Sequence, residues 1–411
     1  MMSMKLPTCL SALLLLCSGC ASDAPADAVR ENFEFAAQQL RYALTEIDRA
    51  KQQLTPEQQE RLLFAPRTVA PDGALQLIAS RDWCSGFFPG ELWYMYEYTG
   101  DTCWREEAEA FTAQVEPEKR NAGTHDMGFK MYCSFGNGYR LTGNPHYREV
   151  LLESAATLIT RYRETVGCIR SWDHNRDKWQ YPVIIDNMMN LELLFWAFRE
   201  SGDSTYYRIA VNHARTTLKN HFRPDNSSYH VVDYDTITGN VLHRHTHQGY
   251  AHESAWSRGQ AWGLYGYTMC YRETQLPEFL EQARRIVDYI FTSETLPADL
   301  VPYWDYQAPN IPDEPRDASA AAVTACALYE LSMYDAVAGA QYKAWADRIV
   351  ESLSTAYRAT PGADRGFLLL HSTGSGNHNS EMDVPLIYAD YYFLEALLKK
   401  ARLEQTGSAL L

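Results

Sequence analysis

One carboxylate stands out because of its surroundings. Asp186 lies within YPVIIDNMMNLELLFWA, a stretch at 181–197 that is otherwise almost entirely apolar. Burying a carboxylate among such side chains costs free energy unless the group is paired or used. In one interpretation Asp186 opens a helix and is stabilised by the helix dipole. In the other, apolar neighbours raise the pKa of its carboxyl group so that it serves as a general acid, with Asn187 and Asn190 hydrogen-bonding it or a ligand.

A second candidate acid, Asp126, occurs in GTHDMGFKMY. Thr124 and His125 precede it and make a good start for a helix, so helix capping is the simpler role. If Asp126 and Asp186 share one cleft, each disfavours ionisation of the other and their pKa values separate. One carboxyl group would then hold a proton while the other stays ionised.

Aromatic and cationic side chains accompany these acids. Trp83 could stack on a sugar ring, and Trp172, in RSWDHNRDKW, is a candidate for lining a cleft. In ESAWSRGQAWGLYGY, Arg258 lies between Trp256 and Trp262, which is not an ordinary core pattern. We expect Arg258 either to bind a ligand carboxylate through both arms of its guanidinium group or to form a structural salt bridge.

Four histidines gather in one segment, and the first three alternate so that they share a face of a predicted strand: His243, His245, His247 and His252. Such a group could ligate zinc. Polar contacts within a hairpin are favoured instead, because Arg244 and Gln248 lie in the same segment and no acidic base follows at the spacing of zinc peptidases. A glycine-rich phosphate loop is also missing, so we expect neither a metal nor a cofactor.

The elements that carry these residues repeat along the chain as a helix, a short turn and a second helix. The turns are EYTGDTCW, RLTGNPHY, RESGDSTY, RETQLPEF and VAGAQY. More apolar helices are predicted at 84–98, 126–141, 184–200, 257–273, 318–335 and 386–402. More amphipathic helices are predicted at 27–53, 103–115, 145–165, 205–221, 277–292 and 341–356. Six apolar and six amphipathic helices predict an all-α fold, an (α/α)6 barrel with the apolar set inside and the amphipathic set outside.

This arrangement would bring the candidate residues together. An antiparallel outer helix separates consecutive inner helices, so all inner helices run in one direction and begin at one mouth. The loops that lead into them are long, at 54–83, 166–183 and 222–256, as expected of a binding face. Within the last loop, YHVVDYDTITGNVLHRHTH predicts a small β-hairpin over the mouth, with its turn at 238–240.

The length fits one large domain or two ordinary ones, and we place a single barrel domain at residues 27–411. The chain has 411 residues, 46% hydrophobic content and a net charge of −15. That charge argues against nucleic acid or an anionic membrane surface as the main partner. Six cysteines follow residue 20 without a CxxC pair, so neither a metal knuckle nor a redox pair is expected: Cys84, Cys103, Cys133, Cys168, Cys270 and Cys326.

The N-terminus carries a targeting signal at residues 1–20. A lysine precedes an apolar run at 10–16, and CSGC follows at 17–20. The pattern is typical of a bacterial lipoprotein signal, apart from the first cysteine, where leucine is usual. Cleavage would leave Cys20 to carry the lipid and residues 21–26 as a tether. Because the apolar run is too short to span a bilayer, we expect a periplasmic or outer-membrane-anchored lipoprotein that meets the membrane only through this lipid.

Taken together, the motifs resemble glycoside hydrolase family 88, the unsaturated glucuronyl hydrolases. The motifs are SGFFPGELWYMYEYTGD, HDMGF, IIDNMMNLELLFWA, SAWSRGQAWGLYGY and EMDVPLIYADYYFLEAL. The family is an (α/α)6 barrel, in agreement with the helix count. Phe88 departs from the family motif, which usually has tryptophan there. Related unsaturated rhamnogalacturonyl hydrolases usually show RGN-W where this chain has RGQAW, which favours the glucuronyl group.

The resemblance implies roles for the candidate residues. Asp186 matches the general acid/base of the family and Asp126 its second essential aspartate. Substrate-contacting positions are matched by His230, Gln248, Trp256, Arg258, Trp262 and Trp83, and we add His125 and Trp172 as further candidates. The segment HSTGSGNHNS (371–380) corresponds to a variable part of the family that helps to distinguish sulfated from unsulfated sugars.

The implied substrate is an oligosaccharide left by a polysaccharide lyase, with a C4=C5 double bond in its terminal uronic acid. A protonated Asp186 would give its proton to C4 and water would add at C5. The hemiketal that results opens and releases the remaining sugar, so the usual two-carboxylate glycoside cleavage is not required. A non-catalytic sugar-binding lipoprotein is an alternative with the same aromatic cleft, and a sugar epimerase would want a histidine pair.

Overall fold

The computed structural model describes residues 24–411. The predicted signal peptide, with Cys20, lies outside the described residues. The first helix, α1 (Ala24–Gln52), already begins within the stretch expected as a tether. Over residues 24–411, none of the helices combines the length and the apolar character that crossing a bilayer requires.

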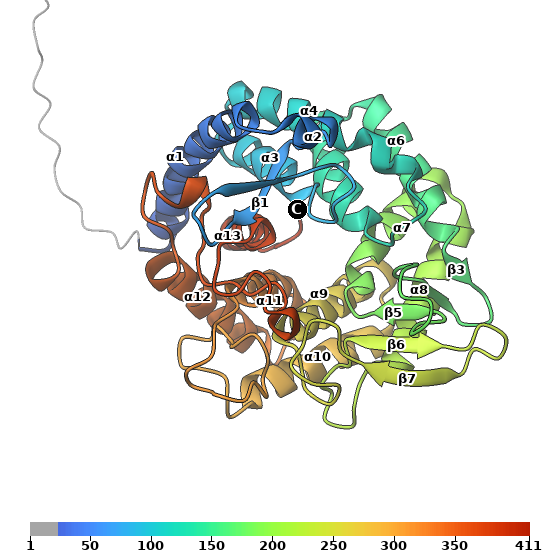
Figure 1. Ribbon diagram of the computed structural model, residues 1–411. Coiled ribbons are helices and arrows are strands. Elements are labelled where there is room, and N and C mark those ends of the chain that lie inside the picture. Colours follow the sequence, from blue (N-terminus) through green and yellow to red (C-terminus); the bar gives the residue numbers. More distant parts are fainter. Residues whose placement is uncertain (1–23) are drawn as a thin grey trace, which may run out of the picture.

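Two concentric rings of helices form the domain (Figure 1). The inner ring contains α3 (Phe87–Thr99), η2 (Gly128–Gly136) continuing into α5 (Asn137–Thr142), α7 (Asn187–Ser201), α9 (Ser257–Thr274), α11 (Ala318–Leu331) and α13 (Ile387–Thr406). The outer ring contains α1, α4 (Thr102–Val115), α6 (Pro145–Ile159), α8 (Ser204–Asn220), α10 (Pro277–Thr292) and α12 (Gly339–Ala356). The predicted (α/α)6 barrel is therefore confirmed, with helix bounds close to those expected.

Short-range chemistry makes the tight turns between the rings. In three of them a glycine in the left-handed region ends the inner helix, and the next residue caps the outer helix with its side chain: Gly100–Asp101, Gly143–Asn144 and Gly202–Asp203. Glycine adopts this backbone conformation without a steric penalty, and the Asp or Asn oxygen accepts from a free N–H of the following helix. Each turn therefore reverses the chain within a few residues.

Small sheets occupy the mouth of the barrel. Two-stranded pairs form from β1 (Ala65–Val69) with β2 (Leu75–Ile78), and from β3 (Tyr162–Arg163) with β4 (Cys168–Ile169). The predicted hairpin is present as β6 (Val231–Tyr234) and β7 (Val241–His245). A third strand, β5 (Pro182–Ile184), pairs with β6.

The third inner helix begins later than predicted. Residues 182–184 form the strand β5, and α7 starts at Asn187, so the expectation of helix from 184 was wrong. The apolar run Val183-Ile184-Ile185 suits a buried strand as well as a helix, and its partner strand lies almost fifty residues away, at Val231. Asp186 therefore stands at a junction between strand and helix.

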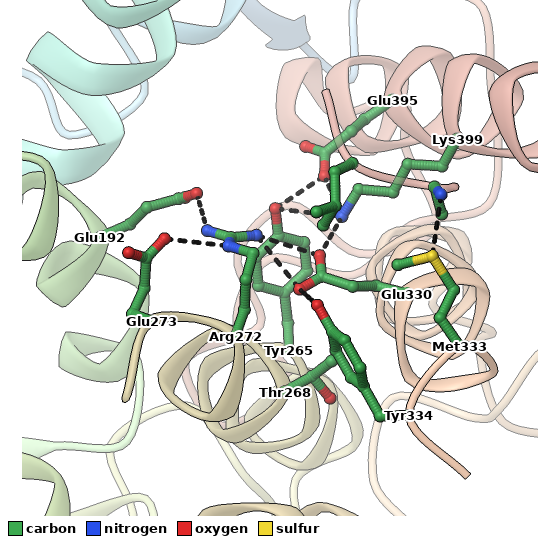
Figure 2. A network of polar contacts seen from close by, with 12 residues as sticks. Glu192, Tyr265, Thr268, Arg272, Glu273, Glu330, Met333, Tyr334, Glu395 and Lys399 are labelled. Carbon is green, nitrogen blue, oxygen red and sulfur yellow. Dashed lines mark hydrogen bonds and ion pairs between the residues drawn. The ribbon is translucent and has the colours of Figure 1, made fainter. Parts of the chain in front are cut away.

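Deeper in the barrel, the inner helices are joined by buried charges (Figure 2). Glu330 of α11 lies 3.0 Å from Arg272 of α9 and 3.2 Å from Lys399 of α13. Lys399 also lies 2.9 Å from Glu395, and Arg272 pairs with Glu192 of α7. Burial opposes ionisation of Glu330, but the two cations outweigh it and hold its pKa below the usual range. These pairs tie four inner helices together beside a cavity of about 270 Å³.

Candidate active site

Asp186 occupies the residue before α7 and is only 7% exposed. Its side chain accepts no capping hydrogen bond from the helix, and its Oδ2 has no hydrogen-bond partner. Asp186 therefore does open the helix, as the capping interpretation expects, but its carboxyl group makes no capping hydrogen bond. Its position leaves the acid buried at the mouth with one oxygen available.

Burial is the main influence on this acid and raises the pKa of Asp186 to about 7. The positive charge of Arg258 and the backbone N–H of Asp186 itself lower the pKa, whereas the negative charge of Asp126 raises it. A carboxyl group with a pKa near neutrality holds its proton at slightly acidic pH and loses it readily, as a general acid must.

His230 faces Asp186 from the residue before β6. Ile184 pairs with Val231, so the residues just beyond these strand ends are brought together, and the N–H of Ile185 donates to the carbonyl of His230 at 3.1 Å. The Nε2 of His230 lies 3.6 Å from Oδ2 of Asp186. This juxtaposition follows from the pairing of β5 with β6.

The backbone decides which nitrogen of His230 carries the proton. Nδ1 accepts from the N–H groups of His247 and Gln248, each at 3.1 Å. Burial lowers the pKa of His230 well below its usual range, so the ring is neutral. A neutral ring whose Nδ1 accepts must carry its hydrogen on Nε2. His230 therefore presents an N–H donor toward Asp186.

Asp126 is held by its immediate neighbours. The hydroxyl of Thr124 donates to its Oδ2 at 2.8 Å, and Nε2 of the buried His125 lies 3.1 Å from its Oδ1. Burial lowers the pKa of His125, so the ring acts as a neutral donor. The Asp126 side chain keeps 18% exposure, and this carboxylate adds the negative charge that raises the pKa of Asp186.

The two asparagines expected beside Asp186 bind other groups. Oδ1 of Asn190 accepts from the N–H groups of Gly128 and Phe129, at 2.8 and 3.2 Å. Nδ2 of Asn187 donates to the carbonyl of Ile169 at 2.8 Å. The expectation that they hydrogen-bond Asp186 was therefore wrong. The alternative, that they bind a ligand, stays a prediction, and Oδ1 of Asn187 and Nδ2 of Asn190 have no hydrogen-bond partner. Because Asn190 accepts from the amides of Gly128 and Phe129, the Asp126 side chain does not cap the helix that follows it.

The helices η2 and α7 also pack closely where Asn190 forms these hydrogen bonds. A Cβ on Gly128 would lie 2.7 Å from the Cα of Asn190, so only glycine allows η2 and α7 to approach this closely. The first part of this inner helix, η2, is a π-helix rather than the α-helix predicted. Insertions of this kind are frequent at functional sites, and here the wide turns begin two residues after Asp126.

Arg258 is bound to other parts of the protein through both of its terminal nitrogens. Its Nη1 lies 2.8 Å from Oδ2 of Asp317 and 2.5 Å from the carbonyl of Thr373, and its Nη2 lies 2.6 Å from the carbonyl of Gly374. Of the two roles expected for Arg258, the structure shows the salt bridge, while binding of a ligand carboxylate stays a prediction, and the Nε of Arg258 has no hydrogen-bond partner. Asp317 was missed by the sequence analysis, where its only signal is a capping residue before an alanine-rich helix.

The segment 371–384 forms a wall beside this arginine. Nε2 of Gln248 donates to the carbonyl of Gly374 at 3.0 Å, and Glu381 receives a two-pronged bond from Arg67, at 2.5 and 3.0 Å. Asn377 donates to the carbonyl of His247 at 3.3 Å. The segment is thus anchored to the hairpin region and to the first sheet. The side chain of Gln248 is part of this anchoring, because it is bonded to Gly374.

Aromatic rings surround the acids at different depths. The ring of Trp256 lies 4.6 Å from that of His230. Trp262 is completely buried, with its ring 5.2 Å from Phe129 and 5.4 Å from Tyr392, so it packs beneath the site. Among the predicted tryptophans, Trp262 thus supports the site from within the core.

Two further tryptophans are half-buried. Trp83 lies 5.3 Å from Phe129 and 4.9 Å from Tyr388. Trp172 stands on another side, 5.5 Å from the ring of His247, whose N–H holds His230. Both rings keep exposed surface. Phe88, by contrast, is buried against Phe111 at 4.8 Å and does not border the site.

The remaining histidines cluster outside the catalytic group. The ring of His245 lies 4.4 Å from that of His243 and 4.1 Å from that of His252, with Trp179 packed against the first two. Throughout residues 24–411, no three His, Cys, Asp or Glu side chains are arranged to hold a metal ion. The same residues contain six free cysteines, of which only Cys103 is exposed.

Comparison with known proteins agrees with this geometry. Residues 65–392 match the model of Glycosyl Hydrolase Family 88. An unsaturated glucuronyl hydrolase of Formosa agariphila is 51% identical over 338 residues, 82% of this chain and 84% of that protein. An unsaturated chondroitin disaccharide hydrolase of Streptococcus pneumoniae is 33% identical, over 81% of this chain and 85% of that protein.

The solved structures agree as well. A crystal structure of an unsaturated glucuronyl hydrolase specific for heparin superposes with a TM-score of 0.85 at 47% identity, covering 92% of this chain and 98% of that one. These relatives favour the glucuronyl over the rhamnogalacturonyl interpretation, and an enzyme over a sugar-binding protein. Matched along most of its length and on both sides of its two acids, the chain belongs to glycoside hydrolase family 88.

Proposed function

We propose that Asp186 is the proton donor of this glycosidase, an unsaturated glucuronyl hydrolase that removes 4,5-unsaturated uronic acid from the non-reducing end of lyase-generated oligosaccharides. The observation that carries the proposal is the buried Asp186 carboxyl group, with a pKa of about 7, an unpaired Oδ2 and no capping hydrogen bond. An acid that must protonate carbon needs such a raised pKa.

The reaction consumes one water and needs no redox partner. Asp186 transfers its proton to C4, and the electrons of the C4=C5 bond form the new C–H bond. Positive charge develops at C5, shared with the ring oxygen, and water adds there. The Asp186 carboxylate takes the proton released by that water. The resulting hemiketal opens: the C5–O5 bond breaks, C5 becomes a ketone, and O5 takes up the proton that the C5 hydroxyl group loses. This leaves a hemiacetal at C1, which collapses to an aldehyde as the bond from C1 to the departing sugar oxygen breaks and the O5 proton passes to that oxygen.

The neighbours of Asp186 keep it ready for this step. Asp126, fixed by Thr124 and His125, remains close enough for its charge to raise the pKa of Asp186. The neutral His230 points an N–H donor toward Asp186. The two side chains form no hydrogen bond in this structure, because 3.6 Å exceeds hydrogen-bonding distance. Burial and the charge of Asp126 favour the protonated acid, and the distance to His230 leaves its Oδ2 unpaired.

The test is an assay with purified protein and lyase-generated unsaturated disaccharides, followed by the loss of ultraviolet absorbance of the conjugated double bond. We expect turnover by the wild type and loss of turnover by Asp186→Asn. Clean turnover of a saturated glucuronide by the same protein would show that the double bond is not required and would refute the proposal.

For the natural substrate, we favour fragments of heparin type. The support is the 47% identity to a hydrolase described as specific for heparin, compared with 33% to one that acts on chondroitin disaccharides. A panel containing unsaturated disaccharides from heparin, chondroitin and hyaluronan checks this, and a higher kcat/KM on the chondroitin product would reverse it.

For location, we propose a lipoprotein anchored through Cys20 and exposed to the periplasm or cell surface. The support is the signal-like sequence of residues 1–20. Metabolic labelling with a radioactive fatty acid in a bacterial host should mark the wild type but not Cys20→Ser. Equal labelling of both would exclude this anchor.

A further inference from the structure

Two amides at the start of η2 lie within reach of two different acceptors. Gly128 and Phe129 open this inner helix, and their N–H groups donate to Oδ1 of Asn190, at 2.8 and 3.2 Å. The same amides belong to the second and third residues after Asp126. We propose that Asn190 is a positioning residue, which occupies these amides and so keeps the Asp126 carboxylate free to act on Asp186. The inference rests on the proposed function, in which Asp186 donates the proton.

The spacing between Asp126 and the two amides is one that aspartate often uses. An aspartate side chain readily accepts from the N–H groups two and three residues further on, in Asx turns and helix caps. In this chain Asp235 accepts in this way at 2.8 and 2.7 Å, and Asp335 does so at 2.9 Å from both amides. Asp126 instead contacts Thr124 and His125. Its carboxylate therefore competes with Asn190 for the amides, and Asn190 holds them.

Burial and close packing fix the position of Asn190. It lies in the first turn of α7, one helical turn after Asp186, and is completely buried. A Cβ on Gly128 would lie 2.8 Å from its Oδ1, so the two helices meet at this bond. Nδ2 of Asn190 has no hydrogen-bond partner, which means that only the acceptor oxygen of this side chain is used. An aspartate here would supply the same acceptor but would add a negative charge near the proton donor.

Three titratable or charged groups face Asp186 from different parts of the fold. His230, before β6, is held by two backbone N–H groups, and Arg258 of α9 is held by its buried ion pair with Asp317. The third group, Asp126, is 18% exposed and contacts only side chains of its own segment. If its carboxylate bound the helix amides, their positive end of the helix dipole would offset its charge and weaken its effect on the pKa of Asp186.

The experiment follows the alkaline limb of the kcat/KM profile, with the full-length protein and a lyase-generated unsaturated disaccharide. Asn190→Ala removes the acceptor, so Asp126 should bind the amides, and we expect the limb to move to lower pH by about 0.5–1 unit. At pH 7 kcat should fall about two- to fivefold, since less of Asp186 is protonated. KM should change little, because Asn190 is completely buried. A raised KM with the limb in place would show that Asn190 binds the substrate itself, and would overturn the proposal.

The conservative variant Asn190→Asp should behave differently. It keeps the acceptor for both amides, so Asp126 stays free, and the limb should remain in place or move to higher pH because a negative charge favours the protonated acid. A shift to lower pH in this variant, which should fold even if Asn190→Ala does not, would contradict the positioning role. The control is Asn32→Ala, which removes another buried asparagine, an acceptor from Arg358 at 3.3 Å, and should leave the limb unchanged.

A double-mutant cycle shows whether Asn190 acts through Asp126. Asp126→Asn should itself move the alkaline limb to lower pH, since the charge beside the proton donor is lost. Adding Asn190→Ala to this variant should move the limb no further, because the charge that Asn190 controls is then absent. A second shift as large as that of Asn190→Ala alone would mean that Asn190 acts by another route, and would refute the proposal.

Failure of the proposed function is distinguishable. The carboxyl carbon of Asp186 can be titrated by nuclear magnetic resonance in protein labelled with ¹³C-aspartate, without substrate, and its signal is identified by its loss in Asp186→Asn. A lower pKa of Asp186 in Asn190→Ala than in the wild type supports the positioning role even if the protein hydrolyses nothing, whereas an equal pKa refutes it. Missing disaccharide turnover by the wild type would instead count against the proposed function.

Discussion

Nε2 of His230 stands 3.6 Å from Oδ2 of Asp186, brought there by the pairing of two strands that lie almost fifty residues apart in sequence. The other ring nitrogen of His230 accepts two backbone N–H groups, which places the hydrogen on Nε2. The acid therefore faces a neutral donor rather than a cation. A cation at this position would lower the pKa of Asp186 and remove the proton that the reaction needs.

Asp186→Asn should abolish turnover while leaving the fold intact. Because the side chain caps no helix N–H, its loss removes chemistry rather than a structural bond. We expect kcat to fall by about 10²–10⁴, the usual contribution of a general acid, with an unchanged circular dichroism spectrum. Activity within a few-fold of the wild type would show that another group donates the proton.

The same variant should be more stable than the wild type at alkaline pH. The folded-state pKa of Asp186 is raised from an ordinary 3.8 to about 7, so the folded protein keeps a proton that the unfolded chain has lost. Stability therefore falls as pH rises from about 4 to about 7, and above that the full cost of a buried charge is present. The cost is at most about 4 kcal/mol. Urea unfolding should show Asp186→Asn more stable at pH 8 and little changed at pH 4, and a less stable variant at pH 8 would contradict the burial of a charge.

The pH profile of kcat/KM should fall above about pH 7, where Asp186 loses its proton. The negative charge of Asp126 raises this pKa, so Asp126→Asn should move the alkaline limb to lower pH as well as reduce the rate. Rates measured across the pH range separate the two effects. If the alkaline limb of the pH profile stays in place in Asp126→Asn, Asp126 acts on the substrate alone.

Asp317→Asn should destabilise the protein and loosen the wall beside the site. Asp317 pairs with Arg258 in full burial, and removal of one partner leaves the other charge uncompensated, at a cost of about 3–5 kcal/mol. Arg258→Lys should loosen the wall as well, because an ammonium group cannot hold the carbonyls of Thr373 and Gly374 as the guanidinium group does. Hydrogen exchange of residues 371–384 should accelerate in both variants. Asp288→Asn, an exposed change of the same kind, serves as the control, and equal exchange in all three proteins would refute the anchoring role.

The reaction run in heavy water should place deuterium at C4 of the released keto acid. Asp186 exchanges its proton with solvent and then gives it to C4, whereas labelled water oxygen should appear at C5. Mass spectrometry and nuclear magnetic resonance of the product check both positions. Labelled oxygen at the anomeric carbon, with no deuterium at C4, would indicate direct hydrolysis of the glycosidic bond.

The barrel and its principal acid were determined by local features of the sequence. Glycine followed by Asp or Asn ends one helix and caps the next within two or three residues, and apolar periodicity assigns each helix to the inner or outer ring. Such signals depend on neighbours along the chain. The isolated carboxylate of Asp186 among apolar residues was equally visible, because its cost can be estimated from composition alone.

Contacts between distant segments were decided only by the tertiary structure. The run before Asp186 became a strand because its partner, Val231, lies almost fifty residues away. Asn190 turned from the acid to the amides of Gly128 and Phe129, and Arg258 closed on Asp317 and on two carbonyls of segment 371–384. A hydrogen bond is satisfied by whichever partner folding brings within about 3 Å, and the sequence states which groups must find partners but not which ones they meet.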